Sequence, residues 1–338
     1  MAAATVAAAS CVLTWFVMRL ALKLAILDLP NERSSHQLPT PRGGGVAIVF
    51  TVVGTWLLAA VYGLVDRQEV VVLAAGGLLV AAIGLADDRS DVPAKWRLLV
   101  HLIAAALLVA ATGGLSAISF GGVSVDLGWA GAILALLYIV WLLNLYNFMD
   151  GIDGIAGVEA VTVALPAAAL LWMTGDTAMA IVTLTVGAAS LGLLVWNWAP
   201  AKIFMGDVGS SFLGYTFGAL AVVSHATSGV SIYAWSILLG VFIVDATVTL
   251  IRRIVTGQKF YKAHRSHAYQ HAVDRYGSHA TVSVAVGVTN IVWLFPVAWF
   301  VVSGRLDGFF GLIIAWLPLL GIAVKYHAGK SSALRDSH

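Results

Sequence analysis

The sequence is poor in charge and has almost no cysteine. Only 11% of its 338 residues are charged, 60% are hydrophobic, and the formal net charge is +2. So small a net charge gives no basis for binding nucleic acid. The single cysteine, Cys11, excludes an intramolecular disulfide and a cysteine-based metal cluster. The many long uncharged runs indicate an all-α, polytopic membrane protein rather than a soluble one.

About eleven transmembrane helices are predicted, forming a single integral membrane domain over residues 1–338. The uncharged run between Asp207 and Asp245 is too long for one crossing, and residues 225–229 supply a turn that splits it. Residues 115–127 alternate weakly around a Gly-Gly pair and predict a small hairpin on the outer side. The predicted spans are 4–27, 43–65, 69–86, 97–114, 128–147, 155–174, 177–196, 209–225, 230–251, 280–302 and 307–325.

The basic residues fall on one side of this predicted bundle. Of the 19 Lys and Arg residues, only Arg67 and Arg305 lie in loops of the other side, which leaves 17. Cytoplasmic loops of membrane proteins are enriched in Lys and Arg. The N-terminus is therefore predicted outside and the C-terminus in the cytoplasm, with the lipid bilayer as a partner.

A polar segment closes the predicted span 128–147. It reads Asn144-Leu-Tyr-Asn147-Phe-Met-Asp150-Gly-Ile-Asp153-Gly. Asn144 and Asn147 are three residues apart and would share a helix face, a spacing that Asp150 and Asp153 repeat. Carboxylates and amides converging at the end of a membrane helix suit Mg²⁺, phosphate oxygens and a sugar or base edge. The alternative is a polar loop between two spans.

Two further acidic segments follow odd-numbered spans. Asp87 and Asp88 are candidates for a metal ligand and a base, because adjacent carboxylates repel each other unless a cation holds both ionised. Their alternative is surface pairing with Lys95 and Arg97. Asp207 precedes Gly and Ser residues that could open a helix toward an anion, and Phe204 could stack on a nucleobase or simply pack.

The fourth segment is the basic loop 252–279. His264, Arg265 and His267 could hold a pyrophosphate, although such loops also bind anionic lipid headgroups. Asp245 is either a functional carboxylate or a buried partner for a loop arginine. His101 and Glu159, near span ends, are expected to pack and to snorkel toward water.

All four segments fall on one predicted side. One active site is therefore expected from the loops 28–42, 87–97, 148–158, 197–210 and 252–279.

These segments resemble the polyprenyl-phosphate N-acetylhexosamine-1-phosphate transferases, a superfamily of the glycosyltransferase family 4 type. The resemblance covers the segment from His36 through Pro-Thr-Pro-Arg-Gly-Gly-Gly45, the Asp-Asp pair, the Asn-x-x-Asn-x-x-Asp-Gly-x-Asp-Gly run, Phe-Met-Gly-Asp and the histidine loop, in the family's order. It implies transfer of a sugar-1-phosphate from a UDP-N-acetylhexosamine to undecaprenyl phosphate, in the bacterial inner (plasma) membrane with the site facing the cytoplasm.

The resemblance also implies roles for individual residues. It assigns Asp207 to Mg²⁺, with Mn²⁺ as an alternative ion, and gives Asp87, Asp88, His264 and His267 catalytic roles. The residues expected to bind substrate are Asn144, Asn147, Asp150, Asp153, Asn197, Phe204 and Arg265.

Two features of the sequence resemble two different branches of the superfamily. Eleven spans resemble the undecaprenyl-phosphate N-acetylglucosamine-1-phosphate transferases, whereas the sparse loop His-Arg-Ser-His resembles the O-antigen-initiating branch. The sugar is N-acetylglucosamine or a 6-deoxy variant such as N-acetylfucosamine or N-acetylquinovosamine, and a homodimer is left open. The rival interpretation, an ion-coupled transporter, would place its charges near the membrane midplane.

Overall fold

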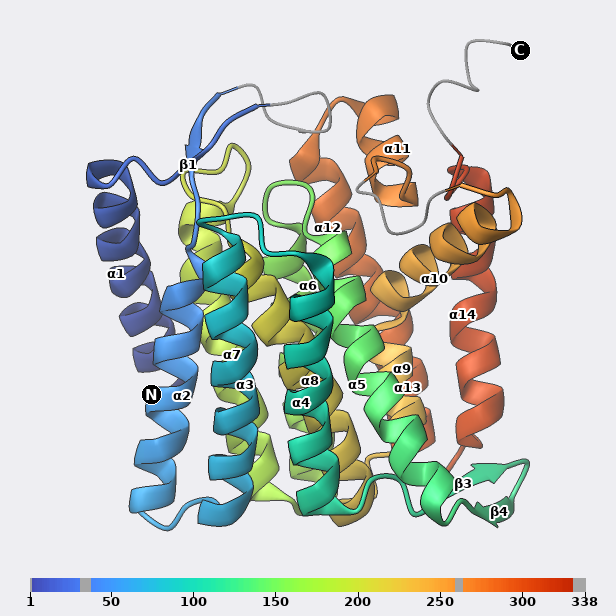
Figure 1. The fold of residues 1–338 in the computed structure, drawn as a ribbon. Helices are drawn as coiled ribbons and strands as arrows, with labels where there is room; N and C mark the ends of the chain where they lie inside the picture. Colours follow the sequence, from blue (N-terminus) through green and yellow to red (C-terminus); the bar gives the residue numbers. More distant parts are fainter. Residues whose placement is uncertain (1, 31–37, 259–263, 331–338) are drawn as a thin grey trace.

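Helices running up and down make up most of the structure (Figure 1). A computed structural model describes residues 2–30, 38–258 and 264–330. His36 and parts of the loops 28–42 and 252–279 lie outside this range. The helices are α1 (Ala2–Lys23), α2 (Gly45–Val61), α3 (Arg67–Asp87), α4 (Ala94–Thr112), α5 (Trp129–Met149), α6 (Ile155–Met173), α7 (Thr177–Asn197), α8 (Asp207–Thr227), α9 (Ile232–Leu238), α10 (Gly240–Val255), α11 (Ala268–Tyr276), α12 (His279–Thr289), the π-helical turn η1 (Asn290–Leu294), α13 (Phe295–Val302) and α14 (Gly308–Lys325).

The prediction of an all-α polytopic membrane protein is confirmed, while the number of spans is only partly supported. Each of the eleven predicted spans coincides with a helix or with consecutive helices. Within the described residues, eight helices are long and apolar enough to cross a membrane, or nine if α9 and α10 form one span. The other two are α2, with 17 residues, and α8, which carries several Ser and Thr side chains.

The predicted span 230–251 is not one straight helix. It breaks between Leu238 and Gly240, where α9 and α10 meet at an angle of 82°. Gly240 lies against Leu319 and Trp316 of α14, and an added Cβ would approach them to 3.2 and 3.3 Å. The break therefore lies where the backbone passes close to a neighbouring helix, which periodicity alone does not reveal.

Two short antiparallel strand pairs lie at opposite ends of the bundle (Figure 1). Strands β1 (Leu27–Asp28) and β2 (Thr40–Pro41) pair at the end where α3 finishes, which we call the upper end. Strands β3 (Ala117–Phe120) and β4 (Val123–Asp126) pair at the lower end through a turn at Gly121 and Gly122, which both have positive φ. The hairpin predicted over 115–127 is thus confirmed.

Helix α8 is the buried centre of the bundle, and glycines bring its neighbours close. Gly84 of α3 lies on the start of α8, where an added Cβ would be 2.6 Å from the carbonyl oxygen of Asp207. Farther along, Gly214 of α8 packs on the backbone of α5 at Leu142 and Leu143. Small residues let membrane helices approach closely. Close packing at Gly84 brings the end of α3 beside the beginning of α8.

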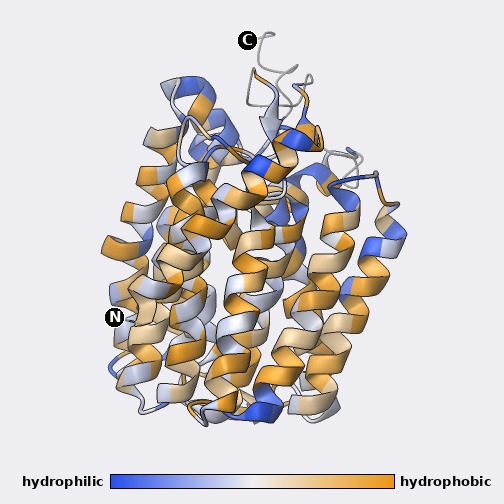
Figure 2. Cartoon of the chain, turned by 90° about the vertical axis from the view of Figure 1, so that its left-hand side faces the viewer, coloured by the Kyte–Doolittle hydropathy of each residue, from blue (hydrophilic) through white to orange (hydrophobic). Residues whose placement is uncertain are grey.

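Hydropathy divides the molecule along its length. Hydrophobic residues dominate the middle of the helices, and hydrophilic residues collect at the ends, most of all at the upper end (Figure 2). Glu159 is an exception inside the bundle: it is 0% exposed, so the expectation that it snorkels toward water was wrong. His101 is also buried, in line with the expectation that it packs.

Candidate active site

Three carboxylates meet where α3 ends and α8 begins. Asp87 is the last residue of α3, Asp88 follows it, and Asp207 is the first residue of α8. Gly206 adopts φ +76°, and an added Cβ there would lie 2.5 Å from the Asp88 carboxylate. A glycine is thus needed for the chain to turn into α8 so close to a side chain.

The carboxylate of Asp88 is buried and has three polar partners. Its side chain is 2% exposed and accepts hydrogen bonds from the backbone N–H groups of Asp207, at 2.8 Å, and Val208, at 3.1 Å. It also pairs with Nε of Arg42 at 2.7 Å. Burial raises the pKa of Asp88, while Arg42 and the two backbone N–H groups act in the opposite direction. Asp88 therefore caps α8 and holds Asp207 in place.

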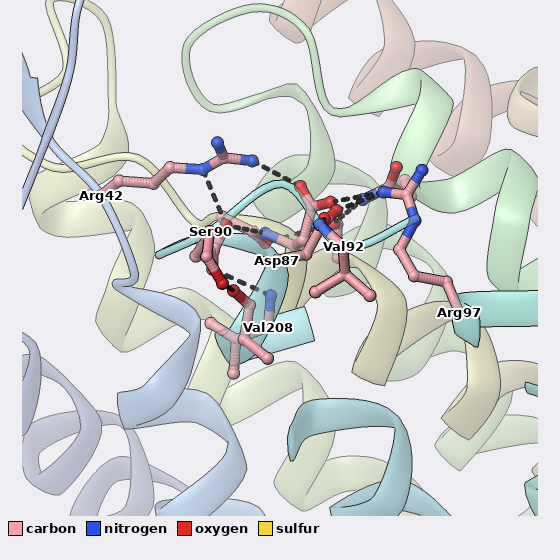
Figure 3. A network of polar contacts seen from close by, with 12 residues as sticks. Arg42, Asp87, Ser90, Val92, Arg97 and Val208 are labelled. Atoms are coloured by element: carbon pink, nitrogen blue, oxygen red, sulfur yellow. Dashed lines mark hydrogen bonds and ion pairs between the residues drawn. The ribbon is translucent and has the colours of Figure 1, made fainter. Parts of the chain in front are cut away.

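Two arginines complete what we call the carboxylate–arginine cluster (Asp87, Asp88, Asp207, Arg42 and Arg97). They reach into it from opposite sides (Figure 3). Nη2 of Arg42 lies 2.5 Å from Asp207 Oδ1. Nη1 of Arg97 pairs with Asp87 and lies 3.4 Å from Asp207 Oδ2. Sequence reasoning assigned Arg42 no role, although Arg42 stands within the Pro-Arg-Gly-Gly-Gly segment. The alternative interpretation of the acidic pair, in which it pairs with Arg97, holds for Asp87. Arg97 also contacts Asp207, which that interpretation did not include.

The two amides of α5 share a helix face, as their spacing predicted, and this face lies beside the cluster. Asn147 Nδ2 donates to Ser210 Oγ at 3.0 Å, and Asn144 Nδ2 donates to its own helix at Val140 O. Asn144, Asn147, Arg97 and Asp207 line a small cavity of about 30 Å³, large enough for about one water molecule. The face shared by Asn144 and Asn147 therefore borders the carboxylate–arginine cluster.

Asp150 and Asp153 do not share a helix face, contrary to the prediction. Helix α5 ends at Met149, and Gly154 has φ +77°, so the chain between them is not helical. Asp150 lies within electrostatic range of Asp207; burial, then the Asp207 carboxylate, raises its pKa to about 7. Asp153 Oδ2 instead accepts from the N–H of Ala201 at 3.0 Å and lies 3.4 Å from Nδ1 of His279.

Asp153 borders a groove of about 690 Å³ that also contains Phe204. His279 lines the same groove, and Lys202 and Arg19 give it a positive character. Asn197 is 2% exposed, and its Nδ2 donates to the carbonyl of Ile203 at 3.0 Å, so Asn197 shapes the loop that carries Phe204. An aromatic ring, a carboxylate and cationic groups suit a base joined to phosphates.

The histidine segment (residues 264–271) forms a second network. Asp245 accepts from the N–H groups of Ala268, at 2.9 Å, and Tyr269, at 3.0 Å, and lies 3.3 Å from Nδ1 of His267. Asp245 is thus a buried partner, as one of its two interpretations proposed, but of the start of α11. Burial, then the neighbouring His267, lowers the pKa of His264 to about 3.

The segment touches the α5 end without joining the cluster. Tyr269 donates its hydroxyl proton to Phe148 O at 3.3 Å. Among the described residues, no hydrogen bond or ion pair links His264 or His267 to Asp87, Asp88 or Asp207. Arg265 pairs with Asp274 at 2.7 Å. The catalytic roles of the two histidines and the substrate role of Arg265 stay predictions.

The chemistry of the cluster fits a divalent cation. Asp87 and Asp207 are the less buried carboxylates, with side chains 11% and 17% exposed. Among the described residues, no three His, Cys, Asp or Glu side chains are already arranged around one metal position. Mg²⁺ commonly takes only one or two protein carboxylates and completes its shell with water and phosphate oxygens. The oxygens of Asp87 and Asp207 are therefore a suitable donor set.

Comparison with known proteins shows the family of this chain. Residues 70–225, which contain Asp87, Asp88, Asp150 and Asp207, match glycosyl transferase family 4. A probable undecaprenyl-phosphate N-acetylglucosaminyl 1-phosphate transferase of Bacillus subtilis (strain 168) is 32% identical over 281 residues, covering 81% of this chain and 77% of the relative.

Two further relatives bear other names. The phospho-N-acetylmuramoyl-pentapeptide-transferase of Geobacillus kaustophilus (strain HTA426) is 31% identical, covering 76% of this chain and 83% of the relative. The decaprenyl-phosphate N-acetylglucosaminephosphotransferase of Mycobacterium tuberculosis (strain CDC 1551 / Oshkosh) is 28% identical, covering 84% of this chain and 78% of the relative. The chain therefore belongs to glycosyl transferase family 4, as a multi-pass membrane enzyme.

Proposed function

We propose that this protein transfers N-acetylhexosamine-1-phosphate from a UDP-sugar to undecaprenyl phosphate, releases UMP and thereby starts a cell-surface polysaccharide such as O-antigen. Family membership makes it a polyprenyl-phosphate sugar-1-phosphate transferase. The observation that supports the finer reaction best is the carboxylate–arginine cluster, at one end of a membrane bundle and beside the groove with Phe204. A soluble nucleotide and a lipid headgroup can meet there.

In the proposed reaction an oxygen of undecaprenyl phosphate attacks the sugar-side phosphorus of the UDP-sugar. The bond from that phosphorus to the bridging oxygen breaks, and the bridging oxygen leaves with UMP. Arg42 and Arg97 would exchange their carboxylate partners for phosphate oxygens, which guanidinium groups bind well. Asp87 and Asp207 would hold Mg²⁺, or Mn²⁺ in its place, and the bound ion supplies charge neutralisation at the diphosphate.

A general base has little to do in this reaction. The second pKa of a phosphate monoester is about 6, so the lipid nucleophile is largely dianionic at neutral pH. Asp88 is engaged by Arg42 and by the start of α8, and we assign it a positioning role rather than that of a base. Phe204 would stack on uracil, with Asp153 and Lys202 nearby in the groove.

We further propose that the upper end faces the cytoplasm of a bacterium. The two basic residues predicted on the other side lie at the lower end, where Arg67 begins α3 and Arg305 precedes α14 (Figure 1). Cysteine labelling in a Cys11→Ala background tests this orientation. An impermeant reagent should not reach residues 87–97 or 197–210 in intact cells, and labelling of either loop from outside would refute the orientation.

The reaction is tested with purified protein, undecaprenyl phosphate, Mg²⁺ and a panel of UDP-sugars that includes UDP-N-acetylglucosamine and its 6-deoxy variants. We expect one sugar to be joined to the lipid with release of UMP. Labelled UMP should exchange into that UDP-sugar only when the lipid product is present. Exchange without lipid would favour a covalent sugar-phosphate enzyme, and active preparations that accept no UDP-sugar at all would contradict the proposal.

A further inference from the structure

Two fully buried polar side chains face each other between α6 and the helix that continues from α12 into η1. Glu159 lies in the second turn of α6 and Asn290 begins η1, and both are 0% exposed. Asn290 Nδ2 donates to Glu159 Oε2 at 2.7 Å and to Thr162 Oγ1 at 2.8 Å. The proposed reaction uses neither residue.

Each of the two side chains has one more buried oxygen. Within the described part of the chain, Glu159 Oε1 and Asn290 Oδ1 have no hydrogen-bond partner. Both are acceptors as long as Glu159 is ionised, and an ionised carboxylate inside an apolar bundle is costly. A single proton on Glu159 Oε1 removes the charge and supplies a donor for Asn290 Oδ1. The acid and the amide would then be able to form a ring of two hydrogen bonds.

A row of contacts joins α12 to α6 and to the loop before α6, and the Glu159–Asn290 pair is the contact farthest from the upper end. At the upper end of that row, Ser283 Oγ donates to the carbonyl of Asp153 at 3.0 Å, and His279 lies beside the Asp153 carboxylate. Between them, Gly287 packs on Val158, where an added Cβ would approach to 2.9 Å. Helix α12 therefore links the buried pair to His279 and to the loop 150–154.

We propose that Glu159 is a protonated acid that forms a closed acid–amide pair with Asn290, and that this pair positions the loop 150–154 for catalysis. A π-helical turn begins at Asn290, and such turns often occur at functional sites. The local widening of the helix presents a side chain at a register that an α-helix would not offer. The effect on turnover rests on the proposed function, whereas the protonation state of Glu159 does not.

The first test uses full-length protein in lipid nanodiscs. Glu159→Gln can form the same ring with Asn290, so it should keep turnover within about twofold and leave Tm unchanged. Glu159→Leu leaves the Asn290 amide with its bond to Thr162 but without its partner on Glu159, and should lower kcat by about 100-fold, the order expected when reacting groups shift by about 1 Å. The double variant Glu159→Leu/Asn290→Leu should recover Tm, because replacing both partners by apolar groups is nearly neutral, but should not recover kcat.

The second test needs no activity. The infrared difference between wild type and Glu159→Gln should contain the C=O stretch of a protonated carboxylic acid, and Glu69→Gln, altered at the lower end of α3, should leave that band in place. Loss of an ionised-carboxylate band instead would overturn the acid–amide pair. An inactive Glu159→Gln protein with wild-type Tm would overturn the positioning role. If no UDP-sugar is accepted, the infrared result still decides the first part by itself.

Discussion

The carboxylate–arginine cluster and the Asp245 network combine similar groups at the same end of the molecule and do different work. In the cluster, the arginine side chains are 31% and 35% exposed, and they share Asp207 between them. In the other network, Asp245 and His267 are 8% and 4% exposed, and Asp245 also holds two backbone N–H groups. Accessible pairs can exchange a partner for a ligand, whereas buried ones hold a segment in place.

The largest effect on turnover should come from a change in the carboxylate–arginine cluster. Asp207→Asn keeps the shape of the side chain and removes the charge that would hold Mg²⁺ and pair with Arg42 and Arg97. We expect sugar transfer to fall roughly 100-fold or more. Turnover measured across a Mg²⁺ titration checks this, with Asp91→Asn in the neighbouring exposed loop as the matched control. Near-wild-type turnover of Asp207→Asn at saturating Mg²⁺ would refute the assignment.

Changes in the buried Asp245 network should lower the free energy of unfolding. Asp245→Ala leaves His267 and the start of α11 without their carboxylate and should cost about 3 kcal/mol, as loss of one partner from a buried pair does. Asp274→Asn breaks the half-exposed pair with Arg265 and should cost less than about 1 kcal/mol. Thermal or denaturant unfolding of the two variants checks the difference. Equal losses would show that burial does not separate these pairs.

The histidines test whether the two networks cooperate. We expect His264→Ala and His267→Ala each to lower turnover by about tenfold, a typical cost for one lost hydrogen bond to a charged group. Because the pKa of His264 is about 3, His264 is neutral between pH 5 and 8, and the loss in its variant should be the same at every pH in that range. His225→Ala at the lower end is the control. If both histidine variants kept the wild-type rate and sugar preference, the alternative for the loop 252–279, binding of anionic lipid headgroups, would be favoured.

The last expected effect is the pH dependence that Asp150 brings to stability. Its pKa rises from about 3.9 in the unfolded chain to about 7 in the folded protein. The folded state therefore binds this proton more tightly, so the contribution of Asp150 to stability is full below about pH 4 and is lost as pH rises through 7. Asp150→Asn should gain stability over wild type between pH 5 and 8, by roughly 1–3 kcal/mol. A difference in Tm that stays constant with pH would contradict this.

Much of the molecule could be predicted from local patterns. Long apolar runs predicted the helices, and the Gly-Gly pair predicted the hairpin between β3 and β4. The spacing of Asn144 and Asn147 correctly predicted a shared helix face, because α5 remains helical through Met149. The same spacing failed for Asp150 and Asp153, since α5 ends at Met149, before either carboxylate.

The sequence by itself determined that this chain is a membrane bundle with acidic and histidine segments at one end, because hydropathy and charge are local properties. Only the tertiary structure decided which charges meet. Arg42 and Asp207 are 165 positions apart, and Asn290 and Glu159 are 131 apart, and each pair meets only through the packing of whole helices. The energy of a charge or amide depends on its partners and its burial. Both are set by residues that are distant in the sequence, which a local pattern cannot identify.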